Sequence, residues 1–320
     1  MKKALQLIDQ DLTKFEDYFS QAVKSNAPLL DRIMQYIVKR KGKQIRPMFV
    51  LLSAKLGGEI TTTTYRAASL VELLHTATLV HDDVVDEARE RRGFFSINAL
   101  WKNKIAVLVG DYLLSKGLLL SLNNHDYKVL QIISEAVKSM SEGELLQIER
   151  SRNLNLNEQI YYDIIKGKTA SLLSSACGAG ACTTFSDDRY IEKMQQFGDK
   201  VGMAFQIKDD LFDYSNQNIG KPTGIDIKEK KLTLPIIYTL THCDKTLRKK
   251  IIYIIKNENR NKEKVQFVVD AVKETGGIEY ATTKMLAFRD EALKLLHEFN
   301  QSDARDALED LVRFTTDRKY

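Results

Sequence analysis

Hydrophobic positions recur along most of this chain with a period near 3.6 residues, which is the period of one face of an α-helix. In the segment 65–80, YRAASLVELLHTATLV, apolar residues fall at 67, 68, 70, 71, 74, 77, 79 and 80. A helix with this pattern is apolar on almost every side, so we expect it to be buried. The segments 128–149 and 280–299 show the same period. No segment alternates convincingly with a period of two, and no Asn-Gly or Asp-Gly pair marks a hairpin.

The positions of proline support long helices. Proline occurs only at Pro28, Pro47, Pro222 and Pro235, so none interrupts residues 48–221. Because a proline costs about 3 kcal/mol in a helix interior, a long proline-free segment allows long helices. No shift in composition, fixed repeat or low-complexity tract marks a linker. The pattern therefore predicts one all-α domain that covers residues 1–320.

The composition indicates a cellular compartment and argues against nucleic acid as a partner. Of the 320 residues 43% are hydrophobic, and the net charge of +5 is too small for this length to favour nucleic acid. The three cysteines lack the spacing of a metal site, and their odd number favours a reduced, cytoplasmic compartment. The N-terminus lacks the apolar core of a signal peptide, and apolar runs such as IAVLVG fall short of a membrane span. We therefore expect a cytoplasmic protein with no transmembrane segment.

Aspartate is concentrated in two segments that share the spacing Asp-Asp-x-x-Asp. On a helix, residues four apart share a face, so these carboxylates lie side by side and repel one another. Two solvated acidic stretches are one interpretation, but both segments are otherwise apolar. A divalent cation would relieve the repulsion, and Mg²⁺ suits it because it takes carboxylate, water and phosphate oxygens. The two clusters are Asp82, Asp83 and Asp86 in LVHDDVVDEARERRG, and Asp209, Asp210 and Asp213 in FQIKDDLFDY.

Basic residues occur in separate short motifs elsewhere in the chain. Any one of these lysines, taken alone, is more often a solvated surface residue. Guanidinium groups bind phosphate oxygens as a two-pronged fork, and lysine binds them as a point charge. No Walker-type motif is present, so we do not expect a nucleotide P-loop. Together the clusters predict a site for two diphosphates, one held through metal and one through Lys and Arg alone. The basic residues are Lys43 and Arg46 in GKQIRP, Arg91 and Arg92, Lys168 in IIKGKTA, and Lys221, Lys230 and Lys231.

With these motifs in this order, the chain resembles the all-trans polyprenyl diphosphate synthases, which are head-to-tail isoprenyl transferases. The resemblance covers nearly the whole chain. It includes EGELLQ at 142–147, Lys168-Thr169-Ala170, and Phe205-Gln206 before the second aspartate cluster. It implies an all-α isoprenoid synthase bundle around a deep central cavity, a homodimer, and Mg²⁺ as cofactor, with about three ions per site held through diphosphate.

The resemblance also implies a role for each matched residue, and it makes isopentenyl diphosphate and an allylic diphosphate the substrates. Catalysis would depend on Asp82, Asp86, Asp209, Lys168 and Gln206. The metal would be held by Asp82, Asp86 and Asp209, and less directly by Asp83, Asp210 and Asp213. The allylic diphosphate would be bound by Arg91, Lys168, Thr169, Gln206, Lys221 and Lys231. Isopentenyl diphosphate would be bound by Lys43, Arg46, His75 and Arg92.

The sequence departs from the family pattern at three places. Lys41 stands where a glycine is usual, Phe94-Phe95 replaces Pro-Thr after Arg-Arg-Gly, and Lys230-Lys231 replaces Gly-Lys before LTLP. None of these changes removes a charged ligand. The phenylalanine pair leaves the structure of the following loop unassigned. Lys230 is an alternative to Lys231 as the diphosphate ligand.

The length of the product depends on the helix that carries Asp82. By resemblance, short-chain enzymes place an aromatic residue about one turn before the first aspartate, where it closes the channel for the growing chain. Here Ala77 and Thr78 are small, so we expect an open channel and a long product, hexaprenyl to octaprenyl, for handing to membrane enzymes. The channel would end deeper, at Leu114, Leu118 and Ile133.

Other interpretations remain open at this point. The chain could make a short product, farnesyl or geranylgeranyl diphosphate, or be the catalytic subunit of a heteromeric synthase. A terpene cyclase shares the first aspartate motif, but its second metal motif differs and it has no use for Lys43, Arg46 and His75. A helical scaffold without activity explains the charges least well.

Overall fold

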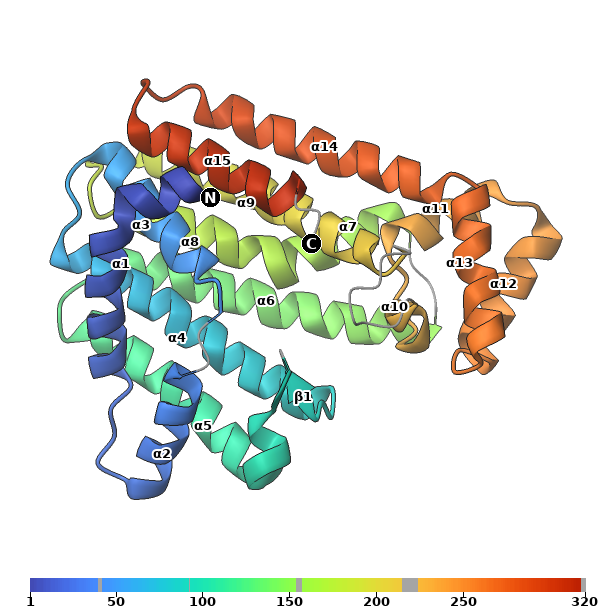
Figure 1. The fold of residues 1–320 in the computed structure, drawn as a ribbon, viewed down its shortest axis with the longest axis horizontal. Helices are drawn as coiled ribbons and strands as arrows, with labels where there is room; N and C mark the ends of the chain where they lie inside the picture. The colour runs from blue at the N-terminus through green and yellow to red at the C-terminus, as the bar shows by residue number, and fades with distance from the viewer. Residues whose placement is uncertain (40–41, 92, 154–156, 215–223, 318–320) are drawn as a thin grey trace. The chain divides into compact units, whose positions relative to one another are not determined.

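The structure, a computed structural model, describes residues 1–320 except 40–41, 92, 154–156, 215–223 and 318–320 (Figure 1). Helices account for 81% of the chain, which confirms the all-α prediction. The elements are α1 (Lys2–Ala22), α2 (Pro28–Val38), α3 (Ile45–Gly57), α4 (Thr62–Val85), β1 (Glu90–Arg91), β2 (Phe94–Phe95), α5 (Ile97–Leu122), α6 (Tyr127–Asn153), α7 (Glu158–Ile165), the π-helix η1 (Lys166–Ala170), α8 (Ser171–Ala181), α9 (Asp188–Phe212), α10 (Ile225–Lys228), α11 (Leu234–His242), α12 (Lys245–Asn257), α13 (Lys262–Glu274), α14 (Gly277–Leu296) and α15 (Asp303–Asp317).

The chain forms two compact units. Most boundaries between them fall inside helices, in keeping with a sequence that shows no linker, and the single domain stays a prediction. Unit 1 consists of Met1–Val137, Leu172–Gln195 and Phe299–Asp310, and unit 2 of Lys138–Ser171, Gln196–Glu298 and Leu311–Tyr320.

Helix α4 is the central element of unit 1. It begins at a capping box in which Thr61 and Thr64 satisfy each other's backbone N–H groups. Its apolar residues are buried against α1, α3 and α5, as the pattern at 65–80 predicts. Helix α5 runs beside α4 (Figure 1) and approaches it closely at Gly117, where an added Cβ would lie 2.7 Å from Leu70. A larger residue at 117 would therefore force the end of the Leu70 side chain to shift.

A short hairpin follows α4 and was not expected from the sequence. β1 and β2 pair antiparallel with Glu90 opposite Phe95 and Arg91 opposite Phe94. Gly93 turns between them at a φ of 77°, a conformation that glycine adopts without strain. Two-residue strands are too short to produce a period of two, so the pattern analysis had no signal there.

Unit 2 is built around an apolar core that α11, α13 and α14 supply together with parts of α7, α9 and α12. Helix α11 begins right after Thr233, with Pro235 in its first turn, where the missing N–H costs nothing. Helix α14 approaches it at Gly277, where an added Cβ would lie 2.6 Å from the Pro235 carbonyl oxygen. Residues of the C-terminal half of α9 and of the segment 158–170 both pack into this core.

Helix α5 presents a stripe of exposed apolar residues. The side facing α4 is buried, whereas Leu108 is 64% exposed and Leu119 51%. Among the described residues it is the one helix long and apolar enough to cross a membrane, judged by length and composition alone. The sequence analysis expected no such segment, because it judged short apolar runs and not the whole helix. The exposed stripe consists of Val107, Leu108, Leu118, Leu119 and Leu122.

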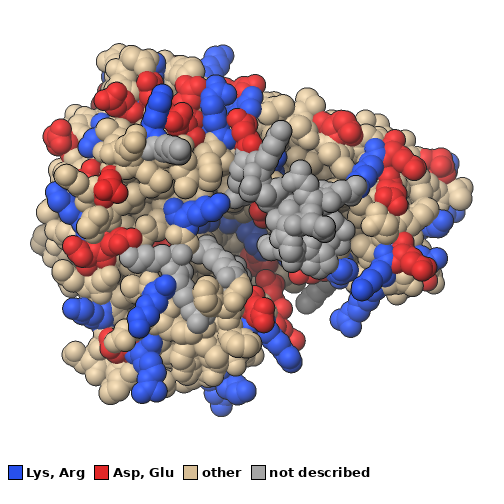
Figure 2. Space-filling view, in the orientation of Figure 1, with Lys and Arg blue, Asp and Glu red and all other residues tan. Residues whose placement is uncertain are grey.

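The two signs of charge are mixed over the surface. On the face shown in Figure 2, Lys and Arg side chains alternate with Asp and Glu side chains, including over α12 and α13. A continuous basic stripe, which favours nucleic acid, does not run across this face.

Candidate active site

The first aspartate cluster occupies the last turn of α4. Asp82 is half-buried, Asp83 is 4% exposed and Asp86, the C-cap, is exposed. The carbonyl end of a helix carries partial negative charge, so carboxylates are unfavourable there, and this last turn contains no basic residue. The Asp83 carbonyl accepts hydrogen bonds from the N–H of Ala88 (2.9 Å) and from Asn98 Nδ2 (3.0 Å). The turn is thus fixed in a place where a bound cation would stabilise it.

The second cluster repeats this arrangement at the end of α9. Asp209 is exposed and Asp210 is 7% exposed, again in a last turn without a basic residue. The sequence predicted that both clusters share one spacing on helices, and the structure confirms the helices for both. Each cluster adds negative charge to the negative end of a helix, which is costly unless something positive binds.

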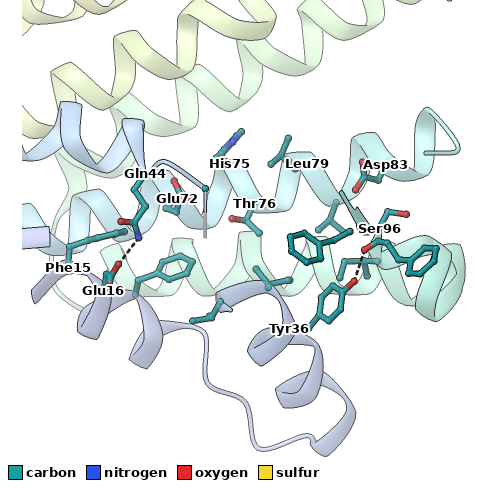
Figure 3. Close-up of a pocket in the computed structure, with 18 residues that line it drawn as sticks. Phe15, Glu16, Tyr36, Gln44, Glu72, His75, Thr76, Leu79, Asp83 and Ser96 are labelled. Carbon is teal, nitrogen blue, oxygen red and sulfur yellow. Dashed lines mark hydrogen bonds between the residues drawn. The ribbon is translucent and has the colours of Figure 1, made fainter. Parts of the chain in front are cut away.

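A cavity of about 280 Å³ lies beside α4 in unit 1 (Figure 3). His75, Leu79 and Asp83 lie on successive turns of α4 along one wall. The opposite walls come from α1, α2, the turn before α3 and the hairpin, and they are rich in aromatic side chains: Phe15, Phe19, Tyr36, Phe94 and Phe95. The cavity therefore joins a predicted isopentenyl residue, His75, to the first aspartate cluster through an apolar interior.

The turn before α3 carries the other predicted isopentenyl ligands. Gly42 and Gln44 line the cavity; Lys43 is exposed and Arg46 half-buried in the first turn of α3. Gln44 adopts a left-handed conformation (φ 50°) and its Nε2 donates to Glu16 Oε1 at 3.1 Å. Backbone N–H groups at the start of a helix and two cations nearby suit an anion. Lys43 and Arg46 thus lie at a turn whose Gly42 and Gln44 line the same cavity as His75.

Tyr36 ties α2 to the hairpin. Its hydroxyl donates to the Phe95 carbonyl oxygen at 2.7 Å (Figure 3). Its ring meets Trp101 edge-on at a centroid distance of 5.1 Å. The sequence analysis left the loop around Phe94-Phe95 open, and this bond is what fixes its second strand. Arg92 and the side chain of Arg91 lie outside the described residues.

Asp210 has both carboxylate oxygens in hydrogen bonds with neutral donors. Tyr161 Oη donates to Oδ2 at 2.7 Å and Gln206 Nε2 donates to Oδ1 at 2.8 Å. Thr169 Oγ1 donates in turn to Gln206 Oε1 at 2.7 Å. Burial raises the pKa of Asp210 to about 7, against the two hydrogen bonds, which lower it. The sequence analysis named Thr169, Gln206 and Asp210 but not Tyr161, which lies on another helix.

Asp213 anchors the turn that begins α10. Its Oδ1 and Oδ2 accept from the backbone N–H groups of Ile225 (2.7 Å) and Asp226 (3.0 Å). Burial raises the pKa of Asp213 despite these bonds. The same turn brings in Asp226, whose pKa rises to about 8 because of burial and the charges of Asp210 and Asp213. Asp226 was missed by the sequence analysis, although an aspartate directly before the basic run KEKK was a visible signal.

Lys168 is held by α6. Its Nζ forms an ion pair with Glu144 and lies 3.5 Å from Gln147 Oε1. The backbones of α6 and η1 touch there, because an added Cβ at Gly143 would lie 2.8 Å from the Lys168 amide nitrogen. π-helical turns occur often at functional sites, and this one presents Lys168 and Thr169 on consecutive positions. Glu144 and Gln147 of the EGELLQ motif, which had no role in the sequence analysis, thus orient a predicted ligand.

Lys230 and Lys231 point to different partners. Lys230 Nζ donates to the Lys256 carbonyl oxygen at 2.9 Å, whereas Lys231 Nζ donates to Glu229 Oε2 at 2.6 Å. The backbone N–H of Lys231 also donates to the Asp226 carbonyl oxygen at 2.8 Å. The Lys230 side chain is therefore occupied at α12, and the role of Lys231 as a diphosphate ligand stays a prediction. Lys221 lies outside the described residues.

The predicted channel residues have different environments. Ala77 and Ile133 are fully buried, and the Thr78 hydroxyl donates to the His75 carbonyl oxygen at 2.8 Å. Leu114 is half-buried. Leu118 is 43% exposed and belongs to the apolar stripe of α5. The role of these residues in a channel stays a prediction.

The donors present fit Mg²⁺ that is completed by a ligand. Among the described residues no three His, Cys, Asp or Glu side chains form a metal site by themselves. Mg²⁺ is usually bound by one or two carboxylates together with water and substrate phosphates. Helix-end carboxylates such as Asp82, Asp86 and Asp209 supply hard oxygen donors of this kind.

Comparisons with known proteins agree with one another. The family model described as polyprenyl synthetase matches residues 27–272. The chain is 33% identical over 322 residues to heptaprenyl diphosphate synthase component 2 of Bacillus subtilis (strain 168), with 100% of this chain and 91% of that protein aligned. A decaprenyl diphosphate synthase structure from Rhodobacter capsulatus has a TM-score of 0.94 at 33% identity and covers 99% of this chain and 98% of its own. A geranylgeranyl pyrophosphate synthase structure from Bacteroides thetaiotaomicron has a TM-score of 0.85 at 34% identity, with 99% and 98% covered.

Proposed function

The chain belongs to the polyprenyl synthetase family of prenyltransferases, and we propose that it condenses isopentenyl diphosphate head to tail with an allylic diphosphate and releases pyrophosphate. The observation that carries this proposal is the repeated placement of an aspartate cluster at the carbonyl end of a helix, with cationic residues grouped in other elements. Such an arrangement suits a reaction in which a multiply charged group departs from carbon.

Asp82, Asp86 and Asp209 would hold Mg²⁺ on the allylic diphosphate, with about three ions completed by phosphate oxygens. When bound, the metal supplies positive charge that stabilises the departing pyrophosphate. Asp83, Asp210 and Asp213 act less directly, since Asp210 and Asp213 bind Tyr161, Gln206 and backbone N–H groups.

The chain's own cations bind the same diphosphate. Lys168, oriented by Glu144, and Lys231, attached to the Asp226 turn, lie in unit 2 with Thr169 and Gln206. Arg91 and Lys221 complete the proposed set. These residues hold the leaving group, while the apolar surroundings keep water away from the carbocation.

Isopentenyl diphosphate would bind on the unit 1 side. Lys43, Arg46, His75 and Arg92 are proposed to bind its diphosphate without metal, and the cavity beside α4 offers Leu79 and aromatic walls to its apolar part. After the new carbon–carbon bond forms, a proton leaves the product. The released pyrophosphate is the proposed acceptor, so no protein base is required.

The product is proposed to be long, hexaprenyl to octaprenyl, in a deep cavity. Ala77 and Thr78 are small residues one turn before Asp82, and Leu114 and Ile133 are the remaining candidates for its end. Similar proteins are named for heptaprenyl and decaprenyl products. The similar geranylgeranyl pyrophosphate synthase keeps a short product as the alternative.

Self-association would cover the apolar stripe of α5, and we propose a homodimer in the cytoplasm that passes its product to membrane enzymes. Leu108, Leu119 and Leu122 form a larger apolar face than scattered surface leucines do. The alternative is a second, different subunit, as the name of the Bacillus subtilis relative, a component 2, indicates for that protein.

One assay tests these proposals together. Purified chain is incubated with Mg²⁺, isopentenyl diphosphate and farnesyl diphosphate, and the dephosphorylated products are sized by chromatography. Long products from the chain alone support a self-sufficient long-chain synthase. No turnover until a second subunit is added points to the heteromeric alternative, and turnover of the allylic substrate without isopentenyl diphosphate indicates a cyclase.

A further inference from the structure

A continuous run of hydrogen bonds in unit 2 links Tyr161 on α7 to Thr169 in η1. It passes from Tyr161 Oη to Asp210 Oδ2 (2.7 Å), from Gln206 Nε2 to Asp210 Oδ1 (2.8 Å), and from Thr169 Oγ1 to Gln206 Oε1 (2.7 Å). The continuous segment of α7 and η1 is thereby connected to α9, which is distant in the sequence, through side chains.

Burial makes this connection rigid. Tyr161 is 4% exposed and Asp210 is 7% exposed. The Tyr161 ring belongs to the apolar core of unit 2, among residues such as Ile165, Ala204 and Ile207. Burial and the neighbouring Asp210 carboxylate raise the pKa of Tyr161 well above its ordinary value, so its hydroxyl keeps the proton that it donates. A buried hydrogen bond of this kind is costly to leave unmade.

Each hydrogen bond in this run has a defined donor and acceptor. Gln206 turns its amide NH₂ group toward Asp210 Oδ1, so its amide oxygen points the other way. The amide oxygen then faces Thr169 and takes its hydroxyl proton. The lone pairs of Thr169 Oγ1 are left to point away from Gln206. Asp210 therefore decides the orientation of two side chains that the sequence placed at the reacting centre.

We propose that Tyr161 is a positioning residue for the allylic diphosphate site, acting through Asp210 to hold Gln206 and Thr169 in one orientation beside Lys168. This inference rests on the proposed function, which assigns Lys168, Thr169 and Gln206 to that substrate. It also divides the second cluster into two roles. Asp209 is exposed and available to metal, whereas Asp210 is an internal support.

The chain supplies a matched control in the next residue. Tyr162 is half-buried, and its hydroxyl donates to Glu158 Oε1 at 2.8 Å, away from Asp210. Tyr161→Phe and Tyr162→Phe each delete one buried or half-buried hydroxyl from the same helix. They differ only in whether the lost bond supports Gln206 and Thr169.

The test compares the two variants by steady-state kinetics and by calorimetric binding of pyrophosphate in the presence of Mg²⁺. For Tyr161→Phe we expect kcat to fall about tenfold to a hundredfold, since a buried partner is left unsatisfied. The KM for the allylic diphosphate and the Kd for pyrophosphate should rise about fivefold, while the KM for isopentenyl diphosphate stays within about twofold. Tyr162→Phe should change each of these values by less than about twofold.

Two results would overturn the proposal. One is a Tyr161→Phe enzyme with unchanged kcat and allylic KM. The other is an equal loss in both tyrosine variants with no difference between the two substrates, which indicates a structural role only. Failure of the proposed function is a separate outcome, because wild-type protein would then show no condensation. Equal pyrophosphate affinities in wild type and Tyr161→Phe would still overturn the positioning role in that case.

Discussion

The two aspartate clusters have the same spacing in the sequence, yet the structure uses them differently. In unit 1, Asp86 is exposed at the C-cap of α4 and the cluster borders an open, apolar cavity. In unit 2, Asp210 and Asp213 have their oxygens occupied by Tyr161, Gln206 and the backbone N–H groups that begin α10. A repeated motif therefore does not imply repeated roles. Two of the three residues in the second cluster are held in hydrogen bonds of the scaffold, whereas the proposed role of the first cluster is to receive a ligand.

Removing the first aspartate of either cluster should have the largest effect. Asp82→Ala and Asp209→Ala should each lower kcat by about a thousandfold or more, because metal-dependent stabilisation of the leaving group is lost. Initial rates in saturating Mg²⁺ measure the effect, and circular dichroism checks that helix content is unchanged. Near-normal turnover of either variant would remove that cluster from the metal site.

A substitution beside the unit 1 cavity should affect the binding of isopentenyl diphosphate and not that of the allylic diphosphate. Arg46→Ala should raise the KM for isopentenyl diphosphate about tenfold to a hundredfold, since a charged hydrogen bond to phosphate is lost. The KM for the allylic diphosphate should stay within about twofold. Lys168→Ala is the opposite case and should act mainly on the allylic substrate. Equal effects of Arg46→Ala on both Michaelis constants would contradict the division between the two units.

The α4 side should also control product length. Ala77 is fully buried one turn before Asp82, and Ala77→Phe puts a ring where a growing chain is proposed to pass. The product should shorten to farnesyl or geranylgeranyl diphosphate while the first condensation continues. Overpacking should also lower stability by about 1–3 kcal/mol. Chromatography of dephosphorylated products checks the length, and a wild-type enzyme that releases mainly farnesyl diphosphate would refute the open channel.

The scaffold role of the second cluster predicts a difference in stability. Asp213→Ala leaves the N–H groups of Ile225 and Asp226 without their acceptor and should lower the free energy of unfolding by about 1–3 kcal/mol. Asp86→Ala, at an exposed C-cap, should change it by less than about 0.5 kcal/mol. Urea unfolding of the metal-free proteins measures both. Equal losses would erase the distinction between the clusters.

The smallest expected effect is on the pH dependence of stability without metal. Burial raises the pKa of Asp226 to about 8, so the folded state keeps a proton that the unfolded state releases near its ordinary, acidic pKa. Between those values the unfolded state binds fewer protons, so stability falls as pH rises. Asp226→Asn should therefore raise Tm at about pH 8 and raise it less at about pH 5, because the loss of stability accumulates as pH rises from the ordinary pKa to the raised one. Asp163→Asn, at an exposed site on α7, is the control and should have no such dependence.

Much of the fold followed from pattern. The period of 3.6 and the proline-free segment 48–221 predicted the long helices, and both aspartate clusters lie on helices as expected. The β1–β2 hairpin escaped because its strands have two residues each. The apolar period of α5 predicted burial but not which side of the helix is buried, so the exposure of Leu118 could not be foreseen.

The charged motif residues of the site could be predicted from the sequence. The residues that join the site only because helices pack together could not. Tyr161 and Asp210 are 49 residues apart, and nothing local in either segment indicates that they meet. A tyrosine in an apolar helix is ordinarily a core residue, and it is the arrangement of α7 against α9 that turns its hydroxyl into a support. The role of Glu144 could not be predicted either, because a backbone contact between α6 and η1 brings its partner Lys168 to it.

That backbone contact has a consequence for how this site tolerates mutation. Gly143 and Gly167 meet with no side chain between them, and an added methyl at either would lie 2.8 Å from a backbone atom, the Lys168 nitrogen or the Ser139 oxygen. Main chain has no alternative rotamers, so it cannot move aside as the end of a side chain can. An evolving or engineered enzyme can therefore exchange charged groups here more easily than it can add one carbon at either glycine. Two uncharged positions that touch no substrate are then among the least replaceable in the site.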